Sequence, residues 1–418
     1  MSSHDDLGRT LRDRADTVGD VHPLSLDDVK GRARGIRRRR VAVTGLAAAA
    51  VLAVAVPTGL VVADRATTQP DVPPVTSPSP DATSPSDESP DVKTVVLDNN
   101  IEERSGKPGI DYLLNGDIVS AEGTATIRSP QGQRPPHEYG ALVRTTESWL
   151  ALWRDDEGRA SIDFVKRGGI VVETRRSQDG IAVSHDGSLA VYSTPQGELR
   201  SYSIFDEHLG INDPAQAPPD VEPVGVLGSR TCKEAEPEGG GCTVFYNDRG
   251  AEAAGYYVTS HGLGDRVGDA MRIAGVSPDG RVSGMVSATD TGSCSQVWGR
   301  DGSVDWETCD YTLGKFSPDG KYVMAFSAYR DGIGDGMVAI LDATTGEPLV
   351  RYRNDDVAQA YVNNAVWDTD DTVLATVFAR GSWSLMRMTP EGELSLVQGL
   401  EALGADGMSP PLVLATQP

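Results

Sequence analysis

A short turn sequence recurs along the chain, each time between an apolar run and an alternating strand. The repeated segments are AVSHDGSLAVYS (182–193), GVSPDGRVSGMVS (275–287), KFSPDGKYVMAFS (315–327) and AVWDTDDTVLATVF (365–378). In Ser-Pro-Asp-Gly, the proline sets the backbone for a type I turn and the glycine takes the left-handed position that closes it. Regular short strands without helical periodicity predict an all-β structure.

The spacing of the repeats predicts a radial arrangement. The aligned residues Asp186, Asp279, Asp319 and Asp370 are 93, 40 and 51 residues apart, and a propeller blade has about 40–50 residues. The first gap has room for two units, so we expect another repeat at 224–246. Weaker copies at 141–153 and 111–123 bring the total to about seven blades. We therefore predict a β-propeller. The alternatives are two β-sandwiches or an open β-solenoid, and neither has units of this length with a turn at the same position in each unit.

All cysteines of the chain lie within the predicted propeller, namely Cys232, Cys242, Cys294 and Cys309. An even number confined to one domain is typical of disulfides formed in an oxidising compartment. The spacings match no usual zinc pattern. We predict two disulfides, with free buried thiols as the alternative.

The pairing of Cys294 with Cys309 follows from the turn between them. Asp301-Gly302 lies at the midpoint, and Asp-Gly between strand-like residues predicts a two-residue hairpin turn. With that turn, Arg300 faces Ser303, and Cys294 faces Cys309. Directly opposed residues have Cα atoms about 4.5–5.5 Å apart, a separation that a disulfide tolerates.

Residues 41–63 carry no charge, and as a helix they are long enough to cross the hydrocarbon core of a membrane. Directly before them stand Arg37, Arg38, Arg39 and Arg40. Cationic flanks stay on the cytoplasmic side, so we predict a single-pass protein of the cell membrane with its C-terminal domain outside. The alternative is a cleaved secretory signal, but the basic leader of such a signal is short.

Residues 64–92 are rich in proline, serine and threonine. Such a segment cannot bury an apolar core, and its composition predicts a disordered, extended stalk. The chain is thus expected to comprise a cytoplasmic basic tail (1–40), a transmembrane helix (41–63), the stalk (64–92) and an extracytoplasmic propeller (93–418).

The charge of the chain is unevenly distributed. The tail carries a net charge of +3 and the whole chain carries −23, so the remainder of the chain carries −26. An acidic body repels nucleic acid, which excludes that class of partner for the propeller.

The tail contains two apolar series at helical spacing, which are Leu7, Leu11, Ala15 and Val18, then Leu26, Val29, Ala33 and Ile36. One hypothesis is that this pair of helices docks on a cytoplasmic partner such as a sigma factor. The other is that the second helix lies on anionic lipid through its arginines. The tail lacks the His and Cys ligands of zinc-type anti-sigma domains.

Catalytic motifs are lacking in the sequence. His185 stands where proline stands in the sibling repeats, so we expect a surface turn residue there. There is no G-x-S-x-G nucleophile elbow and no P-loop. The glycines at 262–268 do not match the dinucleotide fingerprint. We predict that the chain is not an enzyme and needs no cofactor.

Two acidic clusters could gather oxygen atoms around a calcium ion. They are Asp368, Asp370 and Asp371, and Asp331 with Asp335. The first cluster lies at a repeat turn, and the EF-hand pattern with its terminal glutamate is missing. We therefore predict no metal site.

The Val/Phe-Ser-Pro-Asp-Gly turns resemble the repeats of TolB/WD40-like β-propellers, over roughly residues 105–400. The Trp-Asp dipeptide of WD40 blades is not regularly present. The layout, with LGRTLRDRADTV at 7–18, the arginine run, the Ala/Val span and the stalk, is similar to actinobacterial single-pass membrane proteins. Some of these are encoded beside extracytoplasmic-function sigma factors, so the resemblance implies a signalling context.

The function that these features favour is binding of an extracytoplasmic protein, peptide or glycan. One alternative is a transmembrane regulator, similar to anti-sigma factors, whose residues 1–40 bind a cytoplasmic partner. The other is an extracytoplasmic hydrolase or lyase in the propeller channel, which would require convergent histidines or carboxylates.

Overall fold

The computed structural model describes residues 92–203, 208–211, 220–228, 232, 241–250, 253–260, 264–329, 335–355, 360–403 and 412–416. All the regular elements in these residues are β-strands, which confirms the predicted all-β class. None of the described segments is a helix with the length and hydropathy to span a bilayer. Contacts divide the chain into Met1–Ser84 and Pro85–Pro418, and every described residue belongs to the second unit. The tail, the predicted span with Arg37 to Arg40, and the stalk up to residue 91 lie outside the described residues.

Three of the sheets are antiparallel arrays of four strands that follow one another in the sequence. The first comprises β10 (Ile181–Val183), β11 (Ala190–Ser193), β12 (Leu199–Tyr202) and β13 (Leu209–Gly210). The second comprises β14 (Val221–Leu227), β15 (Thr243–Asp248), β16 (Ala254–Thr259) and β17 (Gly264–Arg266). The third comprises β18 (Arg272–Val276), β19 (Val282–Thr289), β20 (Gly292–Trp298) and β21 (Val304–Thr308).

Two further arrays gain a fifth strand from the N-terminal end of the propeller. The first comprises β22 (Tyr311–Phe316), β23 (Tyr322–Ser327), β24 (Met337–Asp342) and β25 (Pro348–Arg353). The second comprises β26 (Tyr361–Trp367), β27 (Val373–Ala379), β28 (Ser382–Met388) and β29 (Leu394–Val397). The added strands β1 (Lys93–Val96) and β2 (Arg104–Ser105) pair in parallel with β25 and β29. They cover strand edges that could otherwise pair with another chain.

The remaining sheet has eight strands and consists of two antiparallel arrays. One comprises β30 (Leu412–Thr416), β3 (Tyr112–Leu114), β4 (Asp117–Ser120) and β5 (Gly123–Thr126). The other comprises β6 (Tyr139–Arg144), β7 (Ser148–Arg154), β8 (Ala160–Lys166) and β9 (Val171–Arg176). A short parallel pairing joins β30 to β6, with Ala415 opposite Leu142.

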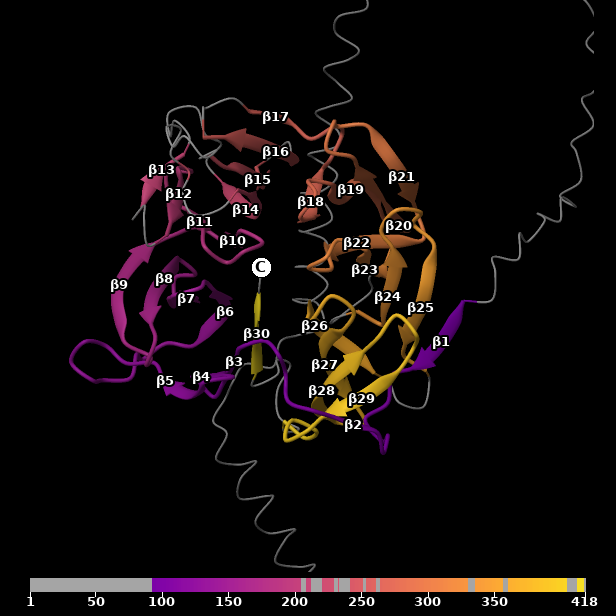
Figure 1. Ribbon diagram of the computed structural model, residues 1–418, viewed down its shortest axis with the longest axis horizontal. Coiled ribbons are helices and arrows are strands. Elements are labelled where there is room, and N and C mark those ends of the chain that lie inside the picture. Colours follow the sequence, from indigo (N-terminus) through magenta and orange to yellow (C-terminus); the bar gives the residue numbers. More distant parts are fainter. Residues whose placement is uncertain are drawn as a thin grey trace, which may run out of the picture. The chain divides into compact units, whose positions relative to one another are not determined.

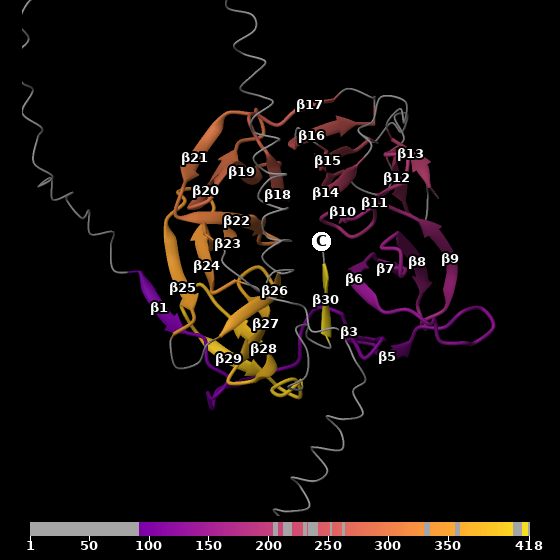
Figure 2. The ribbon, with the colours of Figure 1, turned by 180° about the vertical axis from the view of Figure 1, so that it is seen from behind.

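The arrays follow one another around a common centre, as Figures 1 and 2 show. The strands β30, β6, β10, β14, β18, β22 and β26 lie innermost, and β5, β9, β13, β17, β21, β25 and β29 lie at the periphery. Each buried apolar cluster joins two neighbouring arrays, so the core consists of the seams of the ring. This radial arrangement confirms the predicted β-propeller.

The two ends of the propeller close the ring together. Residues 111–123, predicted as a weaker copy of the repeat, form β3, a turn and β4. These are the second and third strands of their array, and the innermost strand is β30, from the opposite end of the chain. Pairing the two ends of the propeller within one array leaves no open edge at the closing seam. The pattern at 111–123 indicates strands but not their position within an array.

A buried carboxylate fastens this closing seam. The side chain of Asp111, directly before β3, is fully buried. It accepts two hydrogen bonds from the Arg144 guanidinium of β6, at 2.9 and 3.0 Å. A third comes from the Trp149 indole N–H of β7, at 2.7 Å. The backbone carbonyl of Asp111 also accepts the N–H of Ala415 in β30. One residue thus connects the N-terminal segment, the last strand and the neighbouring array.

Three of the predicted turns share one hydrogen-bond design. Each follows an innermost strand and opens with a buried serine whose hydroxyl donates to the aspartate two residues later. The pairs are Ser184 with Asp186, Ser277 with Asp279, and Ser317 with Asp319. The glycine after each aspartate has a positive φ of 71°, 92° or 74°. Burial alone would raise the pKa of these aspartates, but the hydrogen bonds that they accept lower it.

We expect Ser317→Ala to lower the free energy of unfolding by about 1–2 kcal/mol. The Ser317 hydroxyl also accepts the backbone N–H of Tyr322 at 3.0 Å, and this donor would lose its partner. Urea denaturation would measure the loss. Ser395→Ala is the matched control, because the Ser395 hydroxyl has no hydrogen-bond partner in the described part of the chain. Equal midpoints for the two variants would contradict this role of the serine.

The turn that contains Asp370 departs from this design. Its first residue is Asp368 in place of serine, and Asp370 is exposed. The Asp368 carboxylate accepts the backbone N–H groups of Gly109 and Ile110, at 2.7 and 3.1 Å. It also pairs with Arg387 of β28 at 2.7 Å. This turn therefore anchors the N-terminal segment to the last complete array.

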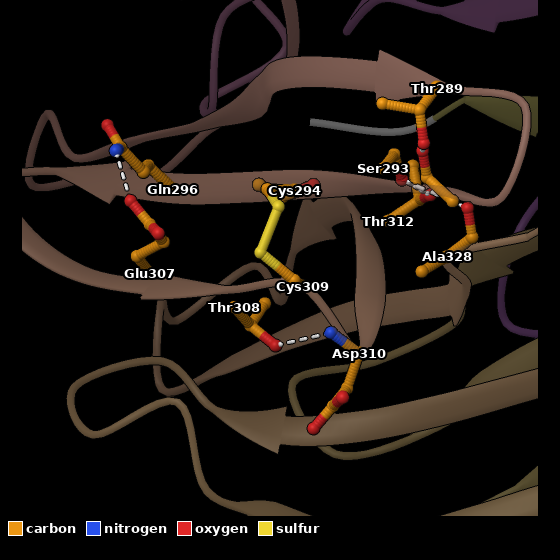
Figure 3. The surroundings of a disulfide bond; sticks show 12 residues. Thr289, Ser293, Cys294, Gln296, Glu307, Thr308, Cys309, Asp310, Thr312 and Ala328 are labelled. Atoms are coloured by element: carbon orange, nitrogen blue, oxygen red, sulfur yellow. Dashed lines mark hydrogen bonds between the residues drawn. A yellow bond between two sulfur atoms is a disulfide. The ribbon is translucent and has the colours of Figure 1, made fainter. Parts of the chain in front are cut away.

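Both predicted disulfides are present, Cys232–Cys242 and Cys294–Cys309. Figure 3 shows the second, which joins β20 to the end of β21. The turn beside it differs from the predicted two-residue type. The backbone N–H of Gly299, not of Arg300, donates to the Ser303 carbonyl across a three-residue loop, and the Gly299 carbonyl accepts the N–H of Gly302.

The predicted cysteine register nevertheless holds, because a bulge compensates for the longer loop. Trp298 faces Val304, but Val297 faces Trp306, so Asp305 is an extra residue in β21. Beyond this bulge, Ser295 faces Thr308, and the cysteines are opposed as expected. A bulge adds one residue to one strand and thereby shifts the register by one.

Candidate ligand-binding channel

The innermost strands surround a cavity of about 990 Å³. This volume lies at the upper end of the range of about 300–1,000 Å³ that is typical of ligand sites. Its apolar wall includes Ile181, Val224, Ile273, Leu313, Met324 and Phe326. Its polar wall includes Asp179, Glu222, Asn247, Arg272, Lys315 and Asn364. The wall therefore combines apolar area with a few placed polar groups, as ligand sites do.

A smaller hollow of about 90 Å³ lies at the end of the channel where the repeat turns gather. His185, Pro278 and Pro318 contribute to its wall. His185 is an exposed turn residue, and its side chain contacts no carboxylate in the described part of the chain. Lys315 and Val366 line both hollows, so Lys315 lies between the repeat-turn end of the channel and the wide cavity.

Close packing of the innermost strands fixes the position of Lys315. A Cβ atom added at Gly275 of β18 would lie 2.8 Å from the Lys315 Cα in β22. The Ser283 hydroxyl of β19 donates to the backbone carbonyl of Gly314 at 2.7 Å. From the other side, the Trp367 indole N–H donates to the Lys315 carbonyl at 3.0 Å. Both neighbouring arrays thus hold the backbone that carries this lysine.

The Lys315 ammonium has no anionic partner among the residues that the structure describes. No described carboxylate lies within ion-pair distance of it, and its side chain has no hydrogen bond in the described part of the chain. Protein surrounds the side chain inside the ring, although water retains partial access. Burial lowers the pKa of Lys315 from 10.5 to about 8, because a low-dielectric environment disfavours the charged form.

We expect Lys315→Met to remove a pH dependence of stability. The folded-state pKa is below the unfolded value, so the penalty is fully present below about pH 8 and disappears as pH rises toward 10.5. One pKa unit corresponds to about 1.4 kcal/mol, and partial access of water reduces the expected gain to about 2 kcal/mol. Urea denaturation from pH 7 to 10.5 would show wild type approaching the more stable variant. Parallel pH profiles would contradict this expectation.

The carboxylates of the wide cavity have cationic partners, with one exception. Asp179 pairs with Arg154 and with Arg249, the latter at 2.7 Å. Burial alone would raise the pKa of Asp179, but the hydrogen bonds from these arginines lower it. Glu222 lies 3.6 Å from Arg272. Asp290, in the exposed turn between β19 and β20, has no ion pair in the described part of the chain.

The structure assembles a polar network around Asp163 that the sequence did not indicate. This carboxylate in β8 is 2% exposed. It accepts hydrogen bonds from Tyr139 (2.7 Å), Trp153 (3.2 Å) and Thr174 (2.6 Å), and His137 lies 3.2 Å away. Burial, with the neighbouring carboxylate, raises the pKa of Tyr139 well above its usual range.

Among the described residues, the His137–Asp163 pair has no nucleophile beside it. The His137 ring stacks on Trp153, with centroids 3.8 Å apart. No serine or cysteine contacts the ring in the described part of the chain, and the activated nucleophile needs such a contact. The network satisfies the hydrogen bonds of a buried charge and stabilises its array.

A second histidine connects two arrays. The His208 ring lies 2.8 Å from the Glu173 carboxylate of β9 and 2.8 Å from the Tyr192 hydroxyl of β11. Its backbone has a φ of 58°, which is unusual for a residue other than glycine. Burial alone would raise the pKa of Glu173, but the hydrogen bonds from His208 and Arg175 lower it. Residues far apart in sequence meet here, so no local motif could have revealed the contact.

The described residues of the acidic clusters considered for calcium do not gather into a site. The Asp368 carboxylate is occupied by Arg387 and by backbone N–H groups. Asp331 lies outside the described residues, whereas Asp335 is buried in an isolated bridge with Val362. Within the described ranges, no three His, Cys, Asp or Glu side chains gather as metal ligands would.

Comparisons with known proteins revealed similarity of structure alone. No protein-family model and no curated protein matches the sequence. Solved structures that are similar include the β-propeller domain of Myceliophteria thermophila Cps50 (Swd1), at 9% identity and a TM-score of 0.42 over 62% of this chain and 86% of that chain. The Dos1 propeller has 11% identity and a TM-score of 0.45 over 72% and 88%. The β-propeller domain of the Trilobed protease from Pyrococcus furiosus has 11% identity and a TM-score of 0.43 over 65% and 86%. Because these TM-scores are below 0.5, the propeller assignment of this chain rests on its own strand order and on the buried apolar clusters between neighbouring arrays.

Proposed function

We propose that the chain is a membrane-anchored, extracytoplasmic propeller of seven blades that binds a protein or peptide ligand and catalyses no reaction. Division of the eight-stranded sheet at the β30–β6 pairing supports this blade count, because each buried cluster then lies between two neighbouring arrays. The single observation that carries the binding role is the cavity of about 990 Å³, with its mixed apolar and polar wall. A glycan is the alternative ligand, and mass spectrometry of the crosslinked adduct would distinguish the two.

Site-specific photocrosslinking tests the binding role. A benzoylphenylalanine at Asn364, an exposed residue of the cavity wall, would report on a bound ligand. The matched control position is Leu349 of β25, which is 38% exposed and does not line the cavity. We expect a discrete adduct in native membranes from position 364 and none from position 349. Adducts at neither position, or the same adducts at both, would overturn the proposal.

The membrane anchor and its orientation rest on the uncharged segment 41–63 and the preceding arginines. Single cysteines in place of Ser3 and Ser86 would be tested with a membrane-impermeant maleimide on intact cells. The native cysteines of the chain are engaged in disulfides. We expect labelling at position 86, and at position 3 only after lysis. Labelling of position 3 on intact cells, or its absence from the mature protein, would overturn the orientation or the anchor.

A regulatory role is a second candidate, which the apolar series of the tail favours. Leu7, Leu11 and Val18 recur at helical spacing within residues 1–40. Pull-downs from native membranes with the full chain and with a chain lacking residues 1–40 would test it. A cytoplasmic protein recovered only by the full chain would support a regulator. The same set of proteins with both baits would mean that the tail is only an anchor.

A further inference from the structure

Lys315 lines both hollows of the channel and has no counterion among the described residues. Lysine is rarely buried unless it is paired, and an uncompensated charge is costly in a low-dielectric environment. The rest of the channel does not supply the missing partner, since Lys315 has neither an ion pair nor a side-chain hydrogen bond in the described part of the chain. A lysine in the wall of both hollows, with no ion pair among the described residues, therefore indicates a role in binding an anion.

The titratable groups around the channel restrict the charge of the ligand. His185 is on the repeat-turn side, and the wide side carries Asp179, Glu222, Arg272, Asp290 and Tyr329. Asp179 and Glu222 already have arginine partners. One ammonium can neutralise one negative charge, and the acidic residues at the wide end repel a polyanion. A ligand with a single negative charge is therefore favoured over a phosphate dianion or a nucleic acid.

The wall on either side of the ammonium restricts the rest of the ligand. Val224, Val276, Phe316 and Trp367 line the hollow that Lys315 shares with the repeat turns. On the wide side, Leu313, Met324 and Phe326 continue the apolar surface. Such a wall limits the access of water and strengthens an ion pair that forms beside it. The complementary ligand carries its charge on an apolar body.

We propose that the Lys315 ammonium is the binding site for the carboxylate of a ligand with an apolar body. This carboxylate is either the C-terminus or an acidic side chain of a bound peptide, or it belongs to a small free acid. The proposal rests on the binding function argued above and specifies the chemistry that the channel recognises. It also gives Lys315 a role that outweighs its cost to folding, because the ligand supplies the missing negative charge.

Calorimetric titration of the full-length protein in detergent micelles would test this site. The probes are 4-phenylbutyrate, its neutral isostere 4-phenylbutyramide and inorganic phosphate. A peptide arm uses acetyl-Leu-Phe-Ala with a free C-terminal carboxylate and the same peptide with a C-terminal amide. We expect at least tenfold tighter binding of each carboxylate than of its amide, and no measurable binding of phosphate. Preference for the peptide carboxylate over 4-phenylbutyrate would identify the peptide as the source of the charge.

Two variants locate the effect. Lys315→Met should abolish the tenfold preference while the protein stays folded, because the change removes an unpaired charge. Lys321→Met, which removes an exposed lysine of the adjacent turn, should leave the preference intact. Equal affinities for acid and amide, tight binding of phosphate, or a preference retained in Lys315→Met would each overturn the proposal. If a crosslink forms at position 364 but one of these results is obtained, the protein binds a ligand and Lys315 is not the site that binds its carboxylate.

Discussion

Asp111→Asn is expected to lower the free energy of unfolding by about 3–5 kcal/mol, the usual cost of breaking a buried ion pair by removing one partner. The substitution keeps the shape of the side chain and removes its charge. The Arg144 guanidinium then loses the carboxylate that it contacts with two hydrogen bonds. Because the weakened side-chain contacts join the start of β3 to Arg144 of β6, we expect hydrogen exchange to accelerate first in β3 and β6.

A surface ion pair of the same array provides the control. Asp117 of β4 pairs with Arg134, whose side chain is 54% exposed. Exposed pairs contribute about 0–1 kcal/mol, so Asp117→Asn should hardly move the urea midpoint. Similar losses in the two variants would mean that Asp111 does not fasten the seam. Uniform acceleration of exchange around the ring would likewise contradict a local role at the closure.

Removal of the Cys294–Cys309 disulfide by the double change to serine should cost about 3 kcal/mol. The bond closes a loop with a sequence separation of 15 residues, and its loss restores the conformational freedom of that loop in the unfolded chain. Urea denaturation without reductant would measure the difference from wild type. A wild-type midpoint that reductant does not change would show that the bond contributes little.

The two disulfides should also differ in their ease of reduction. Cys309 is exposed at the end of β21, whereas Cys232 and Cys242 are 2% and 5% exposed within the core. A thiolate must reach a sulfur atom to open the bond. Mass spectrometry after brief treatment with mild reductant and alkylation should find Cys294 and Cys309 labelled first. The reverse order would contradict the assignment of the buried bond.

Local chemistry explains the parts of the fold that could be predicted. The turns at Asp279 and Asp319 depend on a proline and a glycine within five residues, so their sequence is sufficient to indicate them. The Cys294–Cys309 pairing was correct although its turn was wrong. A hairpin fixes its register through the count of residues, and the bulge at Asp305 restored that count. The closing strand was missed, because strand-forming residues do not encode which array a terminal strand joins.

The candidate site could not be read from the sequence. Lys315 occupies an ordinary position of a repeat, in KFSPDG, and nothing local distinguishes it from a solvated lysine such as Lys321. Only the packing of the arrays into a ring places Lys315 in the channel and Lys321 on the surface. The partners of Asp111, Asp163 and Asp368 likewise come from other strands.

The sequence alone thus determined the turns of the repeats and the Cys294–Cys309 pairing, since each depends on residues within about twenty positions of one another. The tertiary structure decided how the ring closes, which carboxylates have partners and where an ammonium has none among the described residues. These features depend on side chains from different strands, of one array or of neighbouring arrays, that pack together. The radial packing of the arrays creates those contacts, and no short segment of the sequence contains them.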